Sequence, residues 1–142
     1  MSYEEKSIWV FGVVALITYG GYVAVVLGRA DGGRLADVAY VAPMLWSIGG
    51  AVVAGILGRI VTASMWPADA DQRDDRDVEL ARAGERVGQS LVVLGGIIAL
   101  VLAMVEVDHF WIANVLYLGF ILSAVLSTVT QVIGYRRGLP RW

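Results

Sequence analysis

The sequence predicts an all-α membrane protein, a polytopic transmembrane bundle of four helices with both termini in the cytoplasm. The composition, the apolar runs and the placement of the cations support this prediction. Of the 142 residues, 58% are hydrophobic and 17% are charged, whereas soluble domains are about half apolar and about a quarter charged. The mean hydropathy of +0.68 is correspondingly high. A water-soluble globule is therefore not expected.

Four apolar runs are long enough to cross a bilayer, because about 20 helical residues span a hydrocarbon core of about 30 Å. Backbone polar groups in lipid must be satisfied within the segment, which requires helices unless a barrel closes. The runs are continuously apolar rather than alternating, and this pattern argues against a barrel. We expect helices at about 7–27, 38–65, 87–105 and 110–135, within one domain covering 1–142.

Three connections join these runs. A glycine-rich turn follows the first run, and Pro67 ends the second because proline has no N–H to donate. The stretch 66–86 is rich in Asp, Glu and Arg, and we expect it to form a charged cytoplasmic loop. The third connection, 106–109, is so short that the third and fourth helices must be antiparallel neighbours.

The cations predict the orientation, because cytoplasmic flanks of membrane helices carry an excess of Lys and Arg. With four crossings, the termini and the stretch 66–86 share one side. Of the 11 Lys and Arg residues, all except Arg29 and Arg34 fall on that side. We therefore expect a multi-pass protein of the cytoplasmic (inner) membrane with cytoplasmic N- and C-termini.

The residue inventory excludes most catalytic chemistry. The chain has no cysteine and a single histidine, His109, so it lacks the thiolates and paired imidazoles of zinc, haem and redox sites. It has no Ser-His-Asp-like set, and no apolar run contains the carboxylate that a proton-coupled exporter needs. We expect no enzymatic activity, no catalytic residue and no cofactor.

A small polar cluster lies at the predicted outer boundary. Glu106, Asp108 and His109 are weak candidates for a divalent-metal or pH-sensing site, since carboxylates bind hard cations and histidine titrates near neutral pH. The alternative is that Asp108 caps the fourth helix and His109 is a polar interfacial residue.

The stretch 66–86 is net negative, so nucleic acid is not an expected partner. Its spacing does not fit a calcium loop, because the positions that require glycine and glutamate hold other residues. It either begins a solvated helix, with Asp69 or Asp71 as the N-cap and Arg76 paired with Glu79, or binds a protein partner. The candidate partner-binding residues are Asp71, Arg73, Asp74, Asp75, Arg76 and Asp77.

Small residues recur along each apolar run. In lipid, close helix association depends on such residues, because they let backbones approach. They are expected to pack the bundle or, above all on the second helix, to mediate self-association or docking on another membrane protein. The helix-packing candidates are Ser47, Ala51, Gly55, Gly95, Ala99, Gly119 and Ser123.

Arg59 is the only full charge inside an apolar run. Close to a helix end, its side chain can extend to the headgroups at low cost; alternatively, it pairs with Gln89 or Gln131. The fourth run also has a polar side, which forms interhelical hydrogen bonds or lines a pore. Its members are Asn114, Ser123, Ser127, Thr128, Thr130 and Gln131.

Four segments carry a resemblance to a known family: Ser2–Trp9 (SYEEKSIW), Ala42–Trp46 (APMLW), Asp71–Asp77 (DQRDDRD) and Asp108–Asn114 (DHFWIAN). Together they resemble a family of small bacterial four-helix integral membrane proteins with no assigned function. The resemblance covers most of the chain and implies that the charged cytoplasmic stretch is important to the members of that family. It transfers no catalytic residue.

These observations lead to two functional hypotheses. The main one is a non-enzymatic membrane protein that binds a partner, in a regulatory role, through the charged stretch or the small-residue faces. The alternative is a small-solute or ion pathway formed by a homo-oligomer, with the polar side of the fourth helix at its centre. In both cases the bilayer surrounds the chain, and the expected partner is a second copy or another membrane protein.

Overall fold

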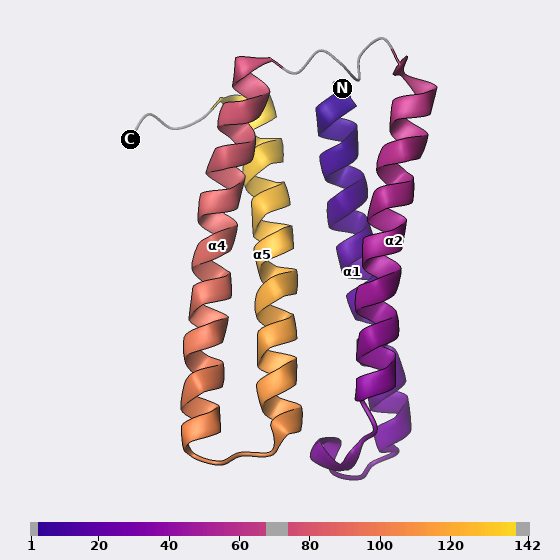
Figure 1. Cartoon of the computed structure of the whole chain (residues 1–142), viewed down its shortest axis with the longest axis vertical. Coiled ribbons are helices and arrows are strands. Elements are labelled where there is room, and N and C mark those ends of the chain that lie inside the picture. The colour runs from indigo at the N-terminus through magenta and orange to yellow at the C-terminus, as the bar shows by residue number, and fades with distance from the viewer. Residues whose placement is uncertain (1–2, 68–73, 139–142) are drawn as a thin grey trace.

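The computed structural model describes residues 3–67 and 74–138, and within these ranges it contains no strand (Figure 1). It confirms the predicted all-α fold of four membrane-length helices. A short 3-10 helix, η1 (Leu35–Asp37), lies between the first two. The four long helices are α1 (Tyr3–Ala30), α2 (Val41–Met65), α4 (Asp75–Met104) and α5 (His109–Arg137).

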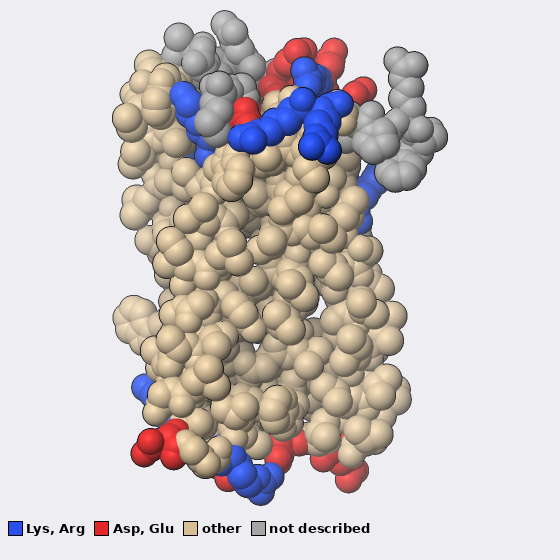
Figure 2. All heavy atoms as spheres, turned by 180° about the vertical axis from the view of Figure 1, so that it is seen from behind, with Lys and Arg blue, Asp and Glu red and all other residues tan. Residues whose placement is uncertain are grey.

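The surface between the two ends of the molecule is apolar. On the face seen in Figure 2, Lys, Arg, Asp and Glu gather towards the ends and leave an uncharged belt between them. Large apolar side chains of the long helices are exposed: Ile17 is 67% exposed and Leu45 is 64% exposed. Contiguous exposure of this kind is unfavourable in water and ordinary in lipid. The fold is that of a multi-pass integral membrane protein.

The helices run antiparallel within each of the two hairpins, α1–α2 and α4–α5, and the hairpins define two ends of the molecule (Figure 1). The terminal end holds the start of α1, the end of α2, the start of α4 and the end of α5. The loop end holds η1 and the α4–α5 turn. The first and last described residues, Tyr3 and Gly138, therefore lie at the same end of the bundle.

The helices extend beyond the predicted apolar runs. α1 includes polar residues at both of its ends, because charged side chains in water do not interrupt a helix. α2 begins at Val41 rather than near 38, after η1, and Pro43 fits in its first turn because N–H groups there need no intrahelical partner. α4 begins at Asp75, so the expected loop 66–86 is corrected: its second half is helical.

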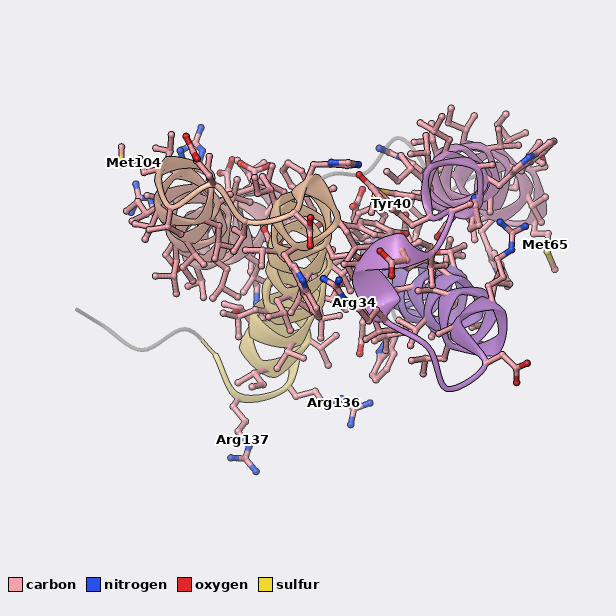
Figure 3. The ribbon with its side chains drawn as sticks, turned by 90° about the horizontal axis from the view of Figure 1, so that it is seen from below. Arg34, Tyr40, Met65, Met104, Arg136 and Arg137 are labelled. Carbon is pink, nitrogen blue, oxygen red and sulfur yellow. The ribbon has the colours of Figure 1, made fainter. Side chains whose placement is uncertain are left out.

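The long helices pack in the order α2–α1–α5–α4. α4 packs along α5, and α1 packs against both α2 and α5, but α2 and α4 share no packed interface within the described ranges. In the view from below, α4 and α2 stand on opposite sides, with α5 between them (Figure 3). The bundle is therefore open along one side.

Glycines bring α4 and α5 close together. A Cβ added to Gly95 would lie 3.3 Å from Cα of Gly119, and one added to Gly88 would lie 2.9 Å from the carbonyl oxygen of Ser123. Ala99, in the same row of α4, is 4% exposed. Four of the helix-packing candidates thus lie in or beside this intramolecular interface, together with Gly88, which sequence analysis did not name.

Candidate functional site

Aromatic side chains close the half of the molecule near the loop end. The rings of Tyr22 and Tyr117 meet edge-on with centroids 5.2 Å apart. Tyr40, which follows η1, packs edge-on against Phe110 at the same separation. These four buried residues join α1, α5 and the α1–α2 connection into one apolar core.

Hydrogen bonds satisfy the polar groups of this core. The Tyr22 hydroxyl donates to Oδ1 of Asn114 at 2.5 Å. The Ser47 hydroxyl donates to the carbonyl of Thr18 at 2.8 Å and is also hydrogen-bonded to the Tyr117 hydroxyl. Because Ser47 is on α2, these bonds tie α2 to both α1 and α5 at this level.

Nearer the terminal end, a cavity of about 1040 Å³ lies between the two hairpins. We call it the groove. Residues of all four long helices line it: α1 and α5 form its floor, and α2 and α4 form its two walls. The large apolar lining residues are Ile8, Val10, Phe11, Val52, Ile56, Val92 and Phe120.

The groove also has a polar lining. Its charged residues come from three helices: Glu4 from α1, Arg59 from α2 and Glu85 from α4. The uncharged polar residues are Ser7, Gln89, Ser123, Ser127, Thr128 and Gln131. Charge, hydrogen-bonding groups and apolar surface therefore meet in one cavity between the long helices.

Arg59 lies in the groove with both of the glutamines that sequence analysis named as its alternative partners, Gln89 and Gln131. The Gln131 amide, however, donates to Oγ of Ser127 at 3.1 Å. In the part of the chain that the structure describes, the Arg59 guanidinium has no hydrogen bond or ion pair. Its backbone carbonyl accepts a bond from the Tyr3 hydroxyl at 3.5 Å.

The polar side of α5 serves two purposes. Its terminal-end members, which include Ser123, Ser127 and Gln131, face the groove, whereas Asn114 belongs to the closed core. Thr130 donates to the Leu126 carbonyl of its own helix at 2.8 Å. The polar side of α5 thus contributes to the groove and to the closed core of one chain.

On α2, the small-residue candidates also point inward. Ser47 is hydrogen-bonded to its neighbours, and Ala51 and Gly55 line the groove. No heavy atom of the described residues lies within 4 Å of a Cβ added to Gly55. Ala51 and Gly55 thus border the open space of the groove.

The charged stretch starts α4 and attaches it to α5. Asp74 is the N-cap, and the Asp77 carboxylate accepts the Asp74 backbone N–H at 3.1 Å, which completes a capping box. Asp77 also accepts a hydrogen bond from the Tyr135 hydroxyl. Arg76 donates to the carbonyls of Gly134 and Tyr135 at 3.3 and 3.2 Å, where a cation complements the end of a helix.

This geometry corrects two expectations. The N-cap of α4 is Asp74 rather than Asp69 or Asp71, and Arg76 bonds to α5 rather than to Glu79. Among the partner-binding candidates, Asp74, Arg76 and Asp77 thus have intramolecular contacts, and Asp75 is exposed. Outside the described residues lie Asp69, Asp71 and Arg73.

The outer polar cluster does not assemble a metal site. Asp108 occupies the N-cap position of α5, but no cap bond of its side chain is seen within the described ranges; its carboxylate lies 3.5 Å from the Arg34 guanidinium. The His109 ring lies beside Tyr40, with centroids 6.1 Å apart. Nowhere among residues 3–67 and 74–138 do three His, Asp or Glu side chains converge, so Glu106, Asp108 and His109 do not form a ligand set.

The fold and the groove define a class of protein: a multi-pass helical membrane protein with an amphipathic cavity between its two hairpins. No protein-family model matches the chain, and the comparisons with curated proteins and with solved structures find no match. The chemistry of the groove is therefore the basis for assigning a function.

Proposed function

We propose that this protein binds a membrane amphiphile in the groove and does not convert it chemically. One observation carries the proposal: a single cavity combines apolar walls with charged and amide side chains, and it opens between α2 and α4. An amphiphile matches this combination, because its chain can lie on the apolar walls and its headgroup can reach the polar end. The missing α2–α4 interface offers it a lateral entrance from lipid.

Binding is favoured over an open aqueous pathway. A pathway through one chain would have to cross the loop-end half, where Tyr22, Tyr117 and Phe110 are each 3–5% exposed. The polar side of α5 is directed into the groove, so it supplies no lining for a pore between copies. The groove therefore supports a binding site that is accessible from one half of the membrane.

Docking of a protein partner on the charged stretch has less support. Arg76 and Asp77 of that stretch bond to α5, and the helix-packing candidates lie at the α4–α5 contact, line the groove or, for Ser47, bond to α1 and α5. Absence of catalysis is part of the proposal, because the serines that line the groove have no histidine beside them: His109 lies at the loop end.

We place the terminal end in the cytoplasm of a bacterial inner membrane, because most Lys and Arg residues lie at that end. The chain has no cysteine, so single-cysteine labelling in intact cells is a direct test. A membrane-impermeant maleimide should label the Asp31→Cys variant and spare the Asp75→Cys variant. The reverse pattern would overturn this orientation.

The binding proposal is tested by filling the groove. Gly55→Phe places a ring in the cavity, whereas Gly49→Phe places the same ring on an exposed position of α2 that does not line it. The readout is the amount of phospholipid that stays bound to protein purified in mild detergent, measured by native mass spectrometry. We expect affinity to fall about tenfold or more in Gly55→Phe only, which corresponds to about 1.4 kcal/mol. Equal retention by the two variants would contradict the proposal.

A further inference from the structure

We propose that the groove selects a zwitterionic phospholipid headgroup with a primary ammonium, that is, phosphoethanolamine. The phosphate is bound by Arg59 and the ammonium by Glu85, on opposite walls of the groove. This inference rests on the proposed function and adds the chemical class of the ligand. Three observations support it: the two residues lie at a similar depth, they carry opposite charges, and neither has an ion pair within the described ranges.

The two residues project from walls that are fixed to the floor at matching positions. Arg59 follows Gly58, whose added Cβ would lie 2.8 Å from Val10 of α1. Glu85 follows Gly84, whose added Cβ would lie 2.7 Å from the amide nitrogen of Gln131 on α5. Each charged residue is therefore adjacent in sequence to a glycine at which a wall helix closely approaches a floor helix.

The two halves of the floor are themselves in register. Gly12 of α1 packs on Thr128 of α5, with 2.7 Å between an added Cβ and Cγ2 of the threonine. Val10 precedes Gly12, and Gln131 follows Thr128, each within a single helical turn towards the terminal end. Because a turn rises by about 5.4 Å, the wall contacts at Val10 and Gln131 lie at nearly the same depth. Arg59 and Glu85 therefore stand at a similar depth on the two facing walls of the groove.

Both charges are available to a ligand. Arg59 and Glu85 line the groove and are exposed, and neither has an ion pair within the described ranges. Glu4 also lines the groove, from α1 on its floor rather than from a wall; it lies in the first turn of α1, where the positive end of the helix dipole offsets part of its charge. One cation, Arg59, and one anion, Glu85, are thus available on the two walls to pair with charges of a ligand.

Neighbouring charges are already engaged. Glu5 lies 3.8 Å from the Arg136 guanidinium, and the Lys6 ammonium lies 3.7 Å from the centre of the Trp66 ring. Neither Glu5 nor Lys6 lines the groove. The charge pattern that a ligand meets on the facing walls is therefore that of Arg59 and Glu85.

This pattern distinguishes classes of headgroup. An anionic lipid would compensate Arg59 and leave Glu85 beside a negative charge, and a cationic amphiphile would do the reverse; each leaves one charge unmatched at a cost. A zwitterion matches both. The guanidinium can hold a phosphate through two parallel bonds, and a primary ammonium, unlike a quaternary one, donates hydrogen bonds to a carboxylate.

The apolar lining fits the chains of such a lipid. Phe11, Val52 and Phe120 line the groove and are 53–56% exposed. They lie deeper in the membrane than Arg59 and Glu85, towards the closed core. Acyl chains that enter between α2 and α4 can cover these side chains while the headgroup stays near the terminal end.

The test is a lipid titration of delipidated protein in detergent, read by native mass spectrometry. The probes are phosphatidylethanolamine, phosphatidylcholine and phosphatidylglycerol with identical acyl chains, and soluble glycerophosphoethanolamine. We expect the ethanolamine lipid to bind about tenfold more tightly than the other two lipids, a difference of about 1.4 kcal/mol. The soluble headgroup should bind far more weakly, because it lacks the acyl contacts.

Charge-neutral variants assign the headgroup contacts. Arg59→Gln should weaken binding of all three lipids, since each carries a phosphate, and Glu85→Gln should remove the preference for ethanolamine over choline. Arg82→Gln and Glu79→Gln, at exposed α4 positions outside the groove, are the matched controls and should bind like the parent protein.

The outcomes separate this inference from the proposed function. Equal binding of the three lipids, or an Arg59 variant that behaves like the Arg82 variant, overturns the headgroup assignment. If Gly55→Phe still weakens lipid binding relative to Gly49→Phe in that case, the amphiphile site stands without the assignment; if it does not, both fail. Equal affinity for the soluble headgroup would overturn a lipid as the occupant.

Discussion

Replacing Gly88 with alanine tests whether α4 and α5 depend on the absence of a side chain at their contact. An added Cβ would lie 2.9 Å from both the carbonyl oxygen and Oγ of Ser123, and 3.3 Å from Cβ of Ser127. The hydroxyl can rotate away, but the backbone oxygen cannot, so the helices must move apart. Overpacking of this kind lowers stability by about 1–3 kcal/mol. Alanine in place of a helical glycine raises stability by about 0.5–1 kcal/mol through its higher helix propensity. We expect a net loss of up to about 2.5 kcal/mol.

Gly96→Ala is the matched control on the same helix. A Cβ there would meet no heavy atom of the described residues within 4 Å, so we expect unchanged stability or a gain of up to about 1 kcal/mol. The assay is equilibrium unfolding in mixtures of mild detergent and dodecyl sulfate, followed by circular dichroism. If Gly88→Ala and Gly96→Ala shift the free energy of unfolding equally, the close-contact reasoning is refuted.

Three further predictions concern the contacts that hold the hairpins together. Gly12→Ala should cost about 1–2 kcal/mol because its Cβ would lie 2.7 Å from Thr128; adding Thr128→Ala should recover part of the loss in a double-mutant cycle, and strict additivity would contradict this contact. Tyr135→Phe removes the hydroxyl that bonds to Asp77 and should cost about 1 kcal/mol, with faster amide exchange at the start of α4; exchange that is unaltered there would count against the bond. Tyr22→Phe should cost about 0.6 kcal/mol, as is usual for a hydrogen bond between membrane helices, and unfolding measurements that show a gain would reject it.

The fold was predictable because a chain that crosses lipid can satisfy its backbone hydrogen bonds in few ways. Four apolar runs in a bilayer must become helices, and the described residues contain four such helices. Their ends were less predictable, since hydropathy marks the part of a helix that lies in lipid and not where its hydrogen bonding stops. The start of α4 is highly charged, yet its Asp74–Asp77 capping box begins a helix well before the apolar run.

The groove was only partly predictable. Arg59 stood out as a charge in an apolar run, and the polar side of α5 was visible as a pattern. Glu85 and Gly84 were not predictable as site residues, because they precede the apolar run in a charged stretch whose hydropathy defines no buried helix face. Above all, the groove exists because α2 and α4 do not pack together. Short stretches of sequence carry no signal for the absence of an interface.

The division of the bundle into a closed half and an open half has a consequence in a membrane. A cavity of about 1040 Å³ could hold roughly 35 waters at about 30 Å³ each. Much of its wall is apolar, however. If water filled the groove, this apolar surface would stay hydrated, and the stabilisation of about 25 cal/mol per Å² that its burial brings would be lost. Acyl chains remove this cost without any change in the protein, and the polar end near Arg59 accommodates a headgroup. The groove is thus better suited to a lipid than to water, and it can stay open without destabilising the helices around it.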